Sequence, residues 1–271
     1  MPKIDLHTHS VFSDGTSSPE ETAYAALKTG ISLYALTDHD TTDGVAQAAR
    51  FCAEHNVRFT TGVEISTREH DHLHFTGYNI DLSNAQFQAF LAQNRQNRRE
   101  RIRQIIAQLQ QAGLPLTEED VFQRAPNTVS RAHVADALRA KGITSSRQAG
   151  FRRYLLPGCV GYVPSAGVSA VEAIQHIKRA GGIAVIAHPG MVTQVWDFPK
   201  WVEAGLDGIE VFYPAHSLAL KQDLLDLARK YGLLCTAGSD YHGPQAGRIK
   251  LPGLRIPQPH YNKLLHALFG K

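Results

Sequence analysis

Short apolar runs of strand length alternate along most of this chain with stretches of helical periodicity. Seven runs predict buried strands: Lys3–Leu6, Leu33–Thr37, Val57–Glu64, Leu73–Tyr78, Ile183–Ala187, Gly208–Phe212 and Leu233–Asp240. Helices are expected between them, from Ser18-Pro19-Glu20-Glu21 to Gly30 and over Thr42–His55, Ser169–Ala180, Leu218–Tyr231 and Pro259–Phe269. This alternation is typical of βα units on a parallel sheet. In a chain of 271 residues it favours an α/β barrel.

The alternation breaks once, between about Ala92 and Ser165. No strand is evident there. A long arginine-rich helix is followed by a helix-start signal at Thr117 and by a further stretch around Asn127–Leu138. We therefore expect residues 1–91 and 166–271 to form the barrel and residues 92–165 to form a small helical insertion domain.

Nine residues with metal-binding side chains lie at the ends of the predicted strands. They are His7, His9, Asp14, His39, Glu64, His74, His188, Asp240 and His242. Strand ends converge on one face of a barrel, so these side chains are expected to bind divalent cations together. Each residue alone has an ordinary structural explanation, but random placement would not put all nine at the same end of a strand.

Two further assignments concern residues that lie close to this set in the sequence. His70, His72 and His74 compete for one ligand position, and the His-Phe-Thr-Gly-Tyr context favours His74. Asp38 is expected to accept a hydrogen bond from an imidazole rather than to bind metal itself.

The order of these motifs resembles the PHP (polymerase and histidinol phosphatase) family. The motifs are Asp5-Leu6-His7-Thr8-His9-Ser10, Ser13-Asp14-Gly15, Thr37-Asp38-His39-Asp40, Gly62-Val63-Glu64, Ala187-His188-Pro189 and Ser239-Asp240-Tyr241-His242. The resemblance implies a distorted (β/α)7 TIM-like barrel with two or three divalent metal ions, most often Mn²⁺, with Fe²⁺ or Zn²⁺ as alternatives. It also implies a distribution of ligands in which Glu64 bridges two ions. The three sets are His7, His9, Glu64 and Asp240; Glu64, His74 and His188; and Asp14, His39 and His242.

Clustered divalent ions suit phosphoester hydrolysis, because they bind phosphoryl oxygens and lower the pKa of a bound water to about 7. The leaving alkoxide then needs an ion or a proton donor. His39 and His216, the latter from Tyr213-Pro214-Ala215-His216, are the candidate donors. The alternative for His216 is a solvent-facing loop histidine.

The insertion carries the residues predicted to select the substrate. The segment Asn127-Thr128-Val129-Ser130-Arg131-Ala132-His133 supplies Asn127, Ser130, Arg131 and His133, and the preceding helix supplies Arg99 and Arg103 alongside Arg98. Arginine can bind phosphate through two N–H groups at once. Arg248 is a weaker candidate. The alternative for each helical arginine is a place on a solvated face.

An arginine-bearing insertion on a short chain is similar to the stand-alone bacterial PHP phosphatases that act on nucleoside 3′,5′-bisphosphates, some of which also trim RNA 5′ ends. That resemblance implies hydrolysis of the 3′-phosphate while insertion arginines hold the other phosphate. One alternative is a histidinol-phosphate phosphatase, whose cationic substrate would require carboxylates near the pocket. A non-catalytic, metal-stabilised module is another.

The composition limits the partners and the compartment. A net charge of +3 favours small phosphorylated nucleotides or short single-stranded RNA over duplex DNA. Three cysteines without CxxC spacing argue against a disulfide framework. The N-terminal segment has no basic-then-apolar leader, and no run of about 18 apolar residues occurs. We therefore expect a cytoplasmic protein without a membrane span.

Overall fold

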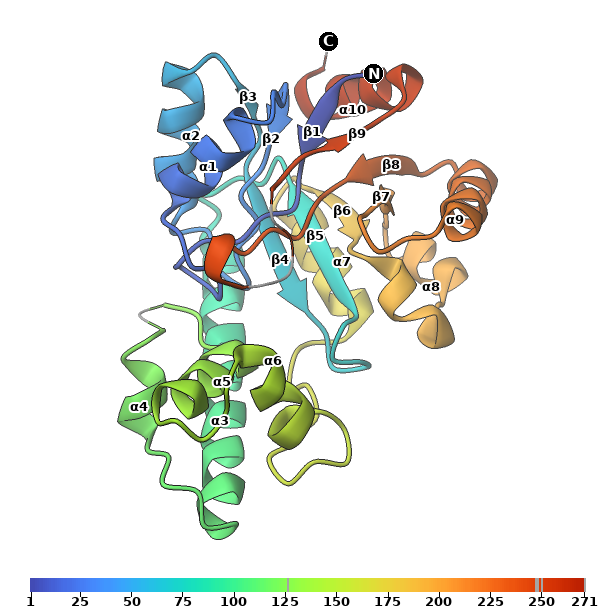
Figure 1. Ribbon diagram of the computed structural model, residues 1–271. Coiled ribbons are helices and arrows are strands. Elements are labelled where there is room, and N and C mark those ends of the chain that lie inside the picture. The colour runs from blue at the N-terminus through green and yellow to red at the C-terminus, as the bar shows by residue number, and fades with distance from the viewer. Residues whose placement is uncertain (126, 247–248, 250, 271) are drawn as a thin grey trace.

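Nine short strands form two sheets in the computed structural model, which describes residues 1–125, 127–246, 249 and 251–270. The first sheet has the order β3-β2-β1-β9 and the second the order β4-β5-β6-β7-β8 (Figure 1). The strands are β1 (Lys3–Asp5), β2 (Leu33–Tyr34), β3 (Arg58–Phe59), β4 (Gly62–Ser66), β5 (His74–Tyr78), β6 (Ile183–Ile186), β7 (Gly208–Phe212), β8 (Leu234–Ala237) and β9 (Leu254–Arg255).

The expectation of a purely parallel sheet is wrong for two strands. β5 runs antiparallel to both β4 and β6, and β9 runs antiparallel to β1. A parallel pair needs a crossover of a dozen residues or more, whereas only a short loop, residues 67–73, joins β4 to β5. The predicted strand Val57–Glu64 is also divided: β3 belongs to the first sheet and β4 to the second. β9, with only two residues, gave no signal in the sequence.

Main-chain hydrogen bonds also join the two sheets. The N–H of Leu6, just after β1, donates to the carbonyl of Ala237 in β8 at 3.0 Å. At the other junction the N–H of Glu64 in β4 donates to the carbonyl of Asp38 at 3.2 Å, and the N–H of Asp40 donates back to Glu64 at 2.9 Å. The chain following β1 and β2 is thereby held beside the ends of β4 and β8.

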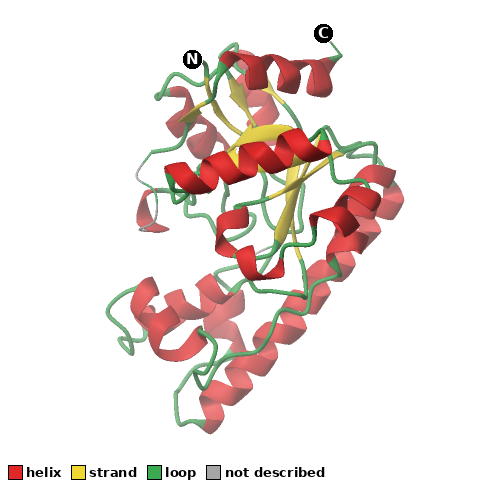
Figure 2. Cartoon of the chain, turned by 90° about the vertical axis from the view of Figure 1, so that its right-hand side faces the viewer, coloured by secondary structure: helices red, strands yellow, loops and turns green. Residues whose placement is uncertain are grey.

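Helices surround the strands, as Figure 2 shows from the side. They are α1 (Pro19–Leu27), α2 (Val45–Glu54), α7 (Ala170–Arg179), α8 (Phe198–Glu203), α9 (Leu218–Tyr231) and α10 (Gln258–Phe269). The helix start expected at Ser18 is confirmed, because Ser18 and Glu21 form a reciprocal capping box. α8, which has six residues, was not anticipated.

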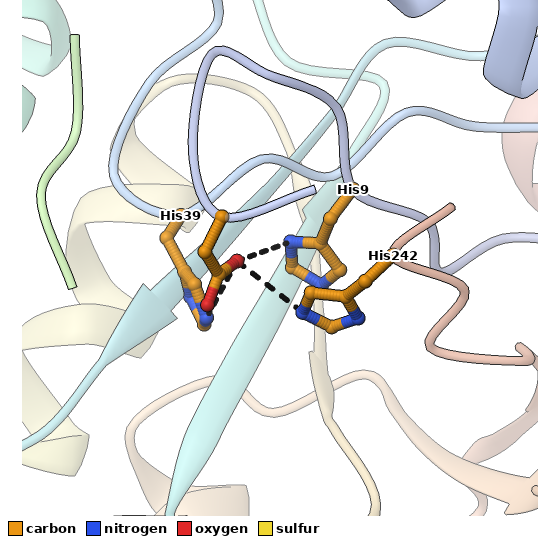
Figure 3. Close-up of side chains that lie close together, drawn as sticks. His9, His39 and His242 are labelled. Carbon is orange, nitrogen blue, oxygen red and sulfur yellow. Dashed lines mark ion pairs between the residues drawn. The ribbon is translucent and has the colours of Figure 1, made fainter. Parts of the chain in front are cut away.

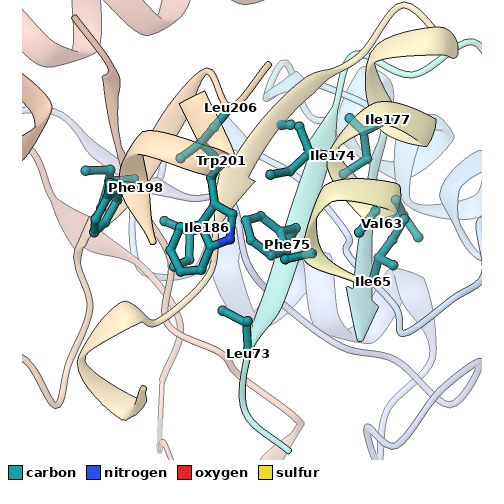
Figure 4. Close-up of a cluster of buried hydrophobic side chains, with 14 of the residues drawn as sticks. Val63, Ile65, Leu73, Phe75, Ile174, Ile177, Ile186, Phe198, Trp201 and Leu206 are labelled. Atoms are coloured by element: carbon teal, nitrogen blue, oxygen red, sulfur yellow. The ribbon is translucent and has the colours of Figure 1, made fainter. Parts of the chain in front are cut away.

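The core of the second sheet lies between its strands and the helices α7 and α8. Phe75 in β5 packs edge-on against Trp201 in α8, with ring centroids 5.5 Å apart, and Ile174 and Ile177 of α7 cover the neighbouring surface (Figure 4). The core residues labelled in the figure are all at most 5% exposed. At about 25 cal/mol per Å² of apolar surface removed from water, this packing is the main force holding the strands in place.

A group of helices with its own core lies at the end of the molecule opposite the N-terminus (Figure 1). It contains α4 (Glu118–Phe122), α5 (Arg131–Ala140), α6 (Arg147–Gly150), the π-turn Phe151–Leu155 and the second half of α3 (Ala85–Gln111). Phe87 and Leu91 of α3 pack in the core of the second sheet, whereas Ile102 and Leu109 pack in the helical core. The boundary predicted at residue 92 therefore lies inside one continuous helix.

Among the described helices, none combines the length and the apolarity that crossing a bilayer requires.

Candidate metal centre

Glu64, in the middle of β4, lies at the centre of the site. Its side chain is 1% exposed, and its two carboxylate oxygens approach five imidazole rings. The ring nitrogens lie between 2.9 and 3.3 Å from these oxygens, in His7, His9, His39, His74 and His188. These histidines follow or begin four different strands, so the sheet arrangement brings together residues that are far apart in the sequence.

Asp14 occupies one side of this centre. Its Oδ1 lies 3.2 Å from Nε2 of His242, 3.9 Å from Nδ1 of His9 and 4.0 Å from Nε2 of His39. Figure 3 shows the three labelled imidazoles facing this carboxylate. Ser130, at the start of α5, donates its hydroxyl to Asp14 Oδ2 at 3.2 Å. The helical region therefore contacts the site directly.

Asp240, which follows β8, occupies another side. Its Oδ1 lies 3.3 Å from Nε2 of His9 and 3.6 Å from Nε2 of His7. The hydroxyl of Tyr213 donates to its Oδ2 at 3.1 Å. Asp240 and His188 both have left-handed backbones, with φ of 57° and 31°. Such conformations cost about 1–3 kcal/mol in a residue other than glycine and are concentrated at functional sites.

Within the described part of the chain, the potential ligand atoms form four overlapping groups, each with its atoms within 4.8 Å of one another. The groups are His9, Asp14, His39 and His242; His7, His9 and Asp240; His7, Glu64 and His188; and His39, Glu64 and His74. All nine predicted residues are present. Glu64 is shared by two groups, in keeping with the bridging position that the family resemblance implies. The grouping differs from the implied one in three ways: His9 also joins the Asp14 group, His7 lies with Glu64 and His188, and His39 also lies with Glu64 and His74.

The donor atoms fit divalent cations. Four of them, His7 Nε2, His9 Nε2, Asp14 Oδ1 and His39 Nδ1, are buried and make no hydrogen bond within the described residues. Buried polar atoms of this kind are rare in folded proteins, and an ion is one of the few ways to satisfy them. Imidazole and carboxylate groups together match the preferences of Mn²⁺, Fe²⁺ and Zn²⁺.

The charges of the site also suit cations. Burial alone would raise the pKa of the Glu64 carboxyl, but the neighbouring His39, His7 and His74 hold it well below its ordinary value. The pKa values of Asp14 and Asp240 are lowered in the same way, mainly by His242 in opposition to burial. Burial lowers the pKa of His74 to about 3, so this imidazole is neutral at pH 7, as a metal ligand must be.

Glu210, in the middle of β7, belongs to the site but was not predicted. Its carboxylate is 1% exposed and lies 3.1 Å from Nδ1 of His7, and it accepts the main-chain N–H of His188 at 2.7 Å. The available signal was a single acidic residue inside the apolar run Gly208–Phe212. A charge buried in a strand requires a partner.

A cavity of about 430 Å³ extends from this centre to the helical region. Glu64, His188 and Tyr213 line one part of it. The lining also includes three arginines, Arg98 and Arg101 from α3 and Arg131 from the start of α5. The cavity is thus bordered by the potential metal ligands and by a group of cationic side chains.

Each of these arginines is paired with a carboxylate. Arg101 and Arg131 approach the two oxygens of Asp71 at 2.7 and 2.9 Å. Arg98 donates to Asp40 at 2.6 Å and to the Ser66 hydroxyl at 2.6 Å. Burial would raise the pKa of Asp71, but Arg131 and Arg101 outweigh it and lower the pKa below its ordinary value.

The structure does not bring Arg99 and Arg103 to the cavity, and that part of the prediction is corrected. Their guanidinium groups lie over the ring of Phe122 at 5.2 and 5.7 Å, and Arg103 also pairs with Glu100 and Glu118. Positions 94, 98 and 101 line the cavity instead. Since residues three or four apart share one face of a helix, 99 and 103 lie on another face.

The segment 127–133 is divided in a similar way. Ser130 and Arg131 line the cavity, whereas Asn127 pairs with Asp43. His133 is buried, and its Nδ1 accepts the N–H of Ser130 at 3.0 Å as part of a helix cap. Neither Asn127 nor His133 is among the described residues that line the cavity. Arg248 lies outside the described residues.

His216 is not placed as a proton donor. It is 5% exposed; its Nδ1 lies 3.0 Å from the carbonyl of Val211, and its Nε2 accepts the N–H of Gly190 at 3.2 Å. Both ring nitrogens are thus engaged by the main chain, and burial lowers its pKa. The solvent-facing alternative is also wrong. His216 instead holds the loop that follows His188.

The expectation that Asp38 accepts a hydrogen bond from an imidazole is also corrected. Asp38 accepts from the N–H and hydroxyl of Ser10 and from the hydroxyl of Ser13, at 2.5 to 2.7 Å, rather than from an imidazole. It therefore fixes the loop that carries Asp14.

Known proteins resemble this chain over most of its length. The model of the PHP domain family matches residues 5–138. A 3′,5′-nucleoside bisphosphate phosphatase of Chromobacterium violaceum is 38% identical over 258 residues, which cover 91% of this chain and 90% of that protein. A 5′-3′ exoribonuclease of Haemophilus influenzae is 36% identical and covers 92% of this chain and 93% of its own. The solved structure of an amidohydrolase from Chromobacterium violaceum, with bound sulfate and no metal, has a TM-score of 0.85 at 35% identity and covers 96% of this chain and 95% of its own.

Proposed function

Because this chain belongs to the PHP domain family and is a metal-dependent phosphoesterase, we propose that it removes the 3′-phosphate from nucleoside 3′,5′-bisphosphates. The observation that carries this proposal is one cavity bordered by both the metal-binding residues and Arg98, Arg101 and Arg131. A bisphosphate presents two phosphates, and such a cavity offers a separate partner to each.

We propose that the nine predicted residues hold two or three divalent ions, with Mn²⁺ as the first candidate, and that Glu64 bridges two of them. When bound, such ions neutralise charge on the phosphoryl oxygens and lower the pKa of water. The four buried donor atoms without a hydrogen bond support this assignment. Tyr213 donates to Asp240 Oδ2, which leaves Oδ1 to face His7 and His9.

The arginines would orient the second phosphate. Arg131 and Arg101 already share one carboxylate, Asp71, so their guanidinium groups are held close together before any substrate arrives. An oxyanion placed between them can accept charge-assisted hydrogen bonds from both. Preorganisation of this kind reduces the entropy lost on binding.

For the proton required by the leaving alkoxide, His39 remains a candidate donor because it lines the cavity. Tyr213 lines it as well and is a second candidate. His216 has no place in this role, because both of its nitrogens face the main chain.

We further propose that residues 1–91 and 166–271 form the distorted (β/α)7 barrel and that residues 92–165 form a substrate-binding insertion. The hydrogen bonds that join β1 to β8 and the chain after β2 to β4 support the barrel. The separate core around Ile102 and Leu109 supports the insertion. A cytoplasmic location is proposed as well, supported by three cysteines that form no disulfide.

Short single-stranded RNA is a second candidate substrate. It is favoured by the relative named a 5′-3′ exoribonuclease, which matches more than nine tenths of this chain. Histidinol phosphate is less well supported. Its ammonium group would need a carboxylate, and Asp40 and Asp71, which line the cavity near the insertion, are both paired with arginine. A non-catalytic module is not supported, since the relatives are named as enzymes over nearly the whole chain.

The test is phosphate release with Mn²⁺ from adenosine 3′,5′-bisphosphate, AMP, histidinol phosphate, an aryl phosphate and a short RNA. The bisphosphate should have the highest kcat/KM. Arg131→Ala should lower kcat/KM for the bisphosphate by about 10- to 100-fold, the loss expected for one charged hydrogen-bond partner, and leave the aryl phosphate almost unchanged. Arg103→Ala, on the outer face, is the matched control and should change neither. Equal losses on both substrates for Arg131→Ala would exclude the proposed role of the arginines.

A further inference from the structure

The carboxylate of Glu210 contacts two of the proposed metal ligands, which come from two other parts of the chain. Its oxygens lie 3.1 and 3.3 Å from Nδ1 of His7, and Oε2 accepts the main-chain N–H of His188 at 2.7 Å. We propose that Glu210 is a positioning residue: it fixes the ring tautomer of His7 and the backbone of His188 so that both can bind metal. This inference rests on the proposed function.

The contact with His7 determines which ring nitrogen is free to bind. A carboxylate only accepts hydrogen bonds, so a neutral His7 must carry its proton on Nδ1 and donate it to Glu210. Nε2 is then left with its lone pair. That atom points into the centre, 3.3 Å from Glu64 Oε1 and 3.6 Å from Asp240 Oδ1, and makes no hydrogen bond within the described residues. A histidine ligand of a metal usually donates its other N–H in this way.

The contact with His188 acts on the main chain. His188 lies two residues beyond the end of β6 and has a left-handed backbone, with φ of 31° and ψ of 53°. The hydrogen bond from its N–H to Glu210 holds this unusual conformation, which carries the imidazole to within 3.0 Å of Glu64 Oε1. One carboxylate thereby places two imidazoles that both approach Oε1 of Glu64.

The packing around Glu210 leaves its side chain little freedom. It lies on β7, between β6 and β8, and is 1% exposed. Gly238, just beyond β8, packs so closely that an added Cβ would collide with Glu210 Oε1 and with Cβ of His7. The absence of a side chain at Gly238 allows the carboxylate to reach the imidazole.

Glu210→Gln tests this role with almost no change of volume. The amide can keep the bond from His188 N–H only by placing its NH₂ group toward His7, which favours a proton on Nε2 and so blocks ligation. Measured by calorimetry with Mn²⁺, affinity should fall by about 10- to 100-fold, the usual effect of losing such a partner. The metal-free variant should keep the circular dichroism of the wild type, although losing one partner of the buried His7–Glu210 pair should lower its Tm.

Two further variants complete the experiment. Asp207→Asn makes the same chemical change just before β7, where Asp207 pairs with Lys178 and accepts the N–H of Ala184, and should leave Mn²⁺ affinity unchanged. Glu210→Asp keeps the negative charge and the acceptor chemistry, so it should recover part of the affinity that Glu210→Gln loses.

The outcomes separate this inference from the proposed function. Wild-type affinity in Glu210→Gln would overturn the role of Glu210, as would Glu210→Asp binding no more tightly than Glu210→Gln. A metal-free Tm well below that of the wild type, with unchanged affinity, would show a purely structural role. If the wild-type protein itself bound no Mn²⁺, the metal centre of the proposed function would fail instead.

Discussion

Oε1 of Glu64 lies 3.0 Å from Nε2 of His188, although the two residues are 124 positions apart in the chain. Glu64 belongs to β4 and His188 to the segment just after β6, and these two strands are not neighbours, because β5 lies between them. β5 runs antiparallel to both strands, so its first residue, His74, lies at the edge where β4 and β6 end. The reversed strand thus adds an imidazole to the site from its N-terminal end.

Glu64→Gln should abolish turnover without unfolding the protein. The substitution keeps the volume but removes the charge that faces five imidazoles, and the proposed bridge between two ions is lost. Metal ions contribute several kcal/mol to stabilising charge in the transition state, so phosphate release should fall by at least about 100-fold. Metal content per chain should fall in parallel, measured by elemental analysis, while circular dichroism remains that of the wild type. Full metal content with normal turnover would contradict the central position of Glu64.

His216→Ala should affect stability more than chemistry. The variant loses two hydrogen bonds that tie the loop after His188 to β7, which should cost about 1–3 kcal/mol in the free energy of unfolding, measured with urea. Loss of a general acid instead costs about 10²- to 10⁴-fold in kcat and removes one limb of the pH profile. We expect less than about a 10-fold loss in kcat and an unchanged profile. A larger loss with a flattened profile would restore His216 as a proton donor.

Most of the candidate metal ligands could be predicted to lie together because they stand near strand ends; Glu64 is the exception, since it lies in the middle of β4. A strand end is a local feature, visible as an apolar run followed by a histidine or an acid. The direction of β5 could not be read in that way, but it did not matter for His74. Reversing the strand exchanges its ends, and His74 begins β5 rather than ending it.

The arginines of α3 that line the cavity were harder to predict, because their position depends on which face of α3 is turned inward. Arg98 lies two helical turns after Leu91 and one turn before Ile102, both of which are buried, so the apolar period could have favoured it over Arg99 and Arg103. The sequence also indicated Glu210, since it is an acid inside a predicted buried strand. Nothing in the sequence indicated Asp71. Its pairing with Arg101 and Arg131 depends on how the loop between β4 and β5 meets the helices, which is a tertiary arrangement.

Asp71→Asn should reveal the charge held by these two arginines through the pH dependence of stability. The pKa of Asp71 in the folded protein is lowered below the ordinary 3.8, so its ionised form stabilises the fold above about pH 4, and this contribution is lost as the pH falls through the folded pKa. The variant should be less stable than the wild type by about 1–3 kcal/mol at pH 7, and this difference should be smaller at pH 3. Urea unfolding at both pH values measures this.

Inorganic phosphate offers a further check on Asp71→Asn. With the carboxylate gone, Arg101 and Arg131 lack their shared partner, and an added anion should take its place. We expect millimolar phosphate to raise the Tm of Asp71→Asn more than that of the wild type when both are free of metal. Arg103→Ala, which leaves Asp71 and its partners intact, should respond as the wild type does. An equal response in all three proteins would argue against an anion site between these arginines.

Gly238→Ala should separate metal binding from general stability. An added methyl group would collide with Glu210 Oε1 and with Cβ of His7, and relieving that overlap should cost about 1–3 kcal/mol in the free energy of unfolding. Because the displaced atoms orient His7, Mn²⁺ affinity should fall as well, by about 10-fold or more. Gly181→Ala is the matched control: Gly181 has a φ of 73° with no atom near its missing Cβ, so alanine there strains the backbone without touching the site. That variant should lose about 1 kcal/mol of stability and bind Mn²⁺ as the wild type does. Equal Mn²⁺ affinities in the two variants, at similar losses of stability, would mean that the close approach at Gly238 serves packing alone.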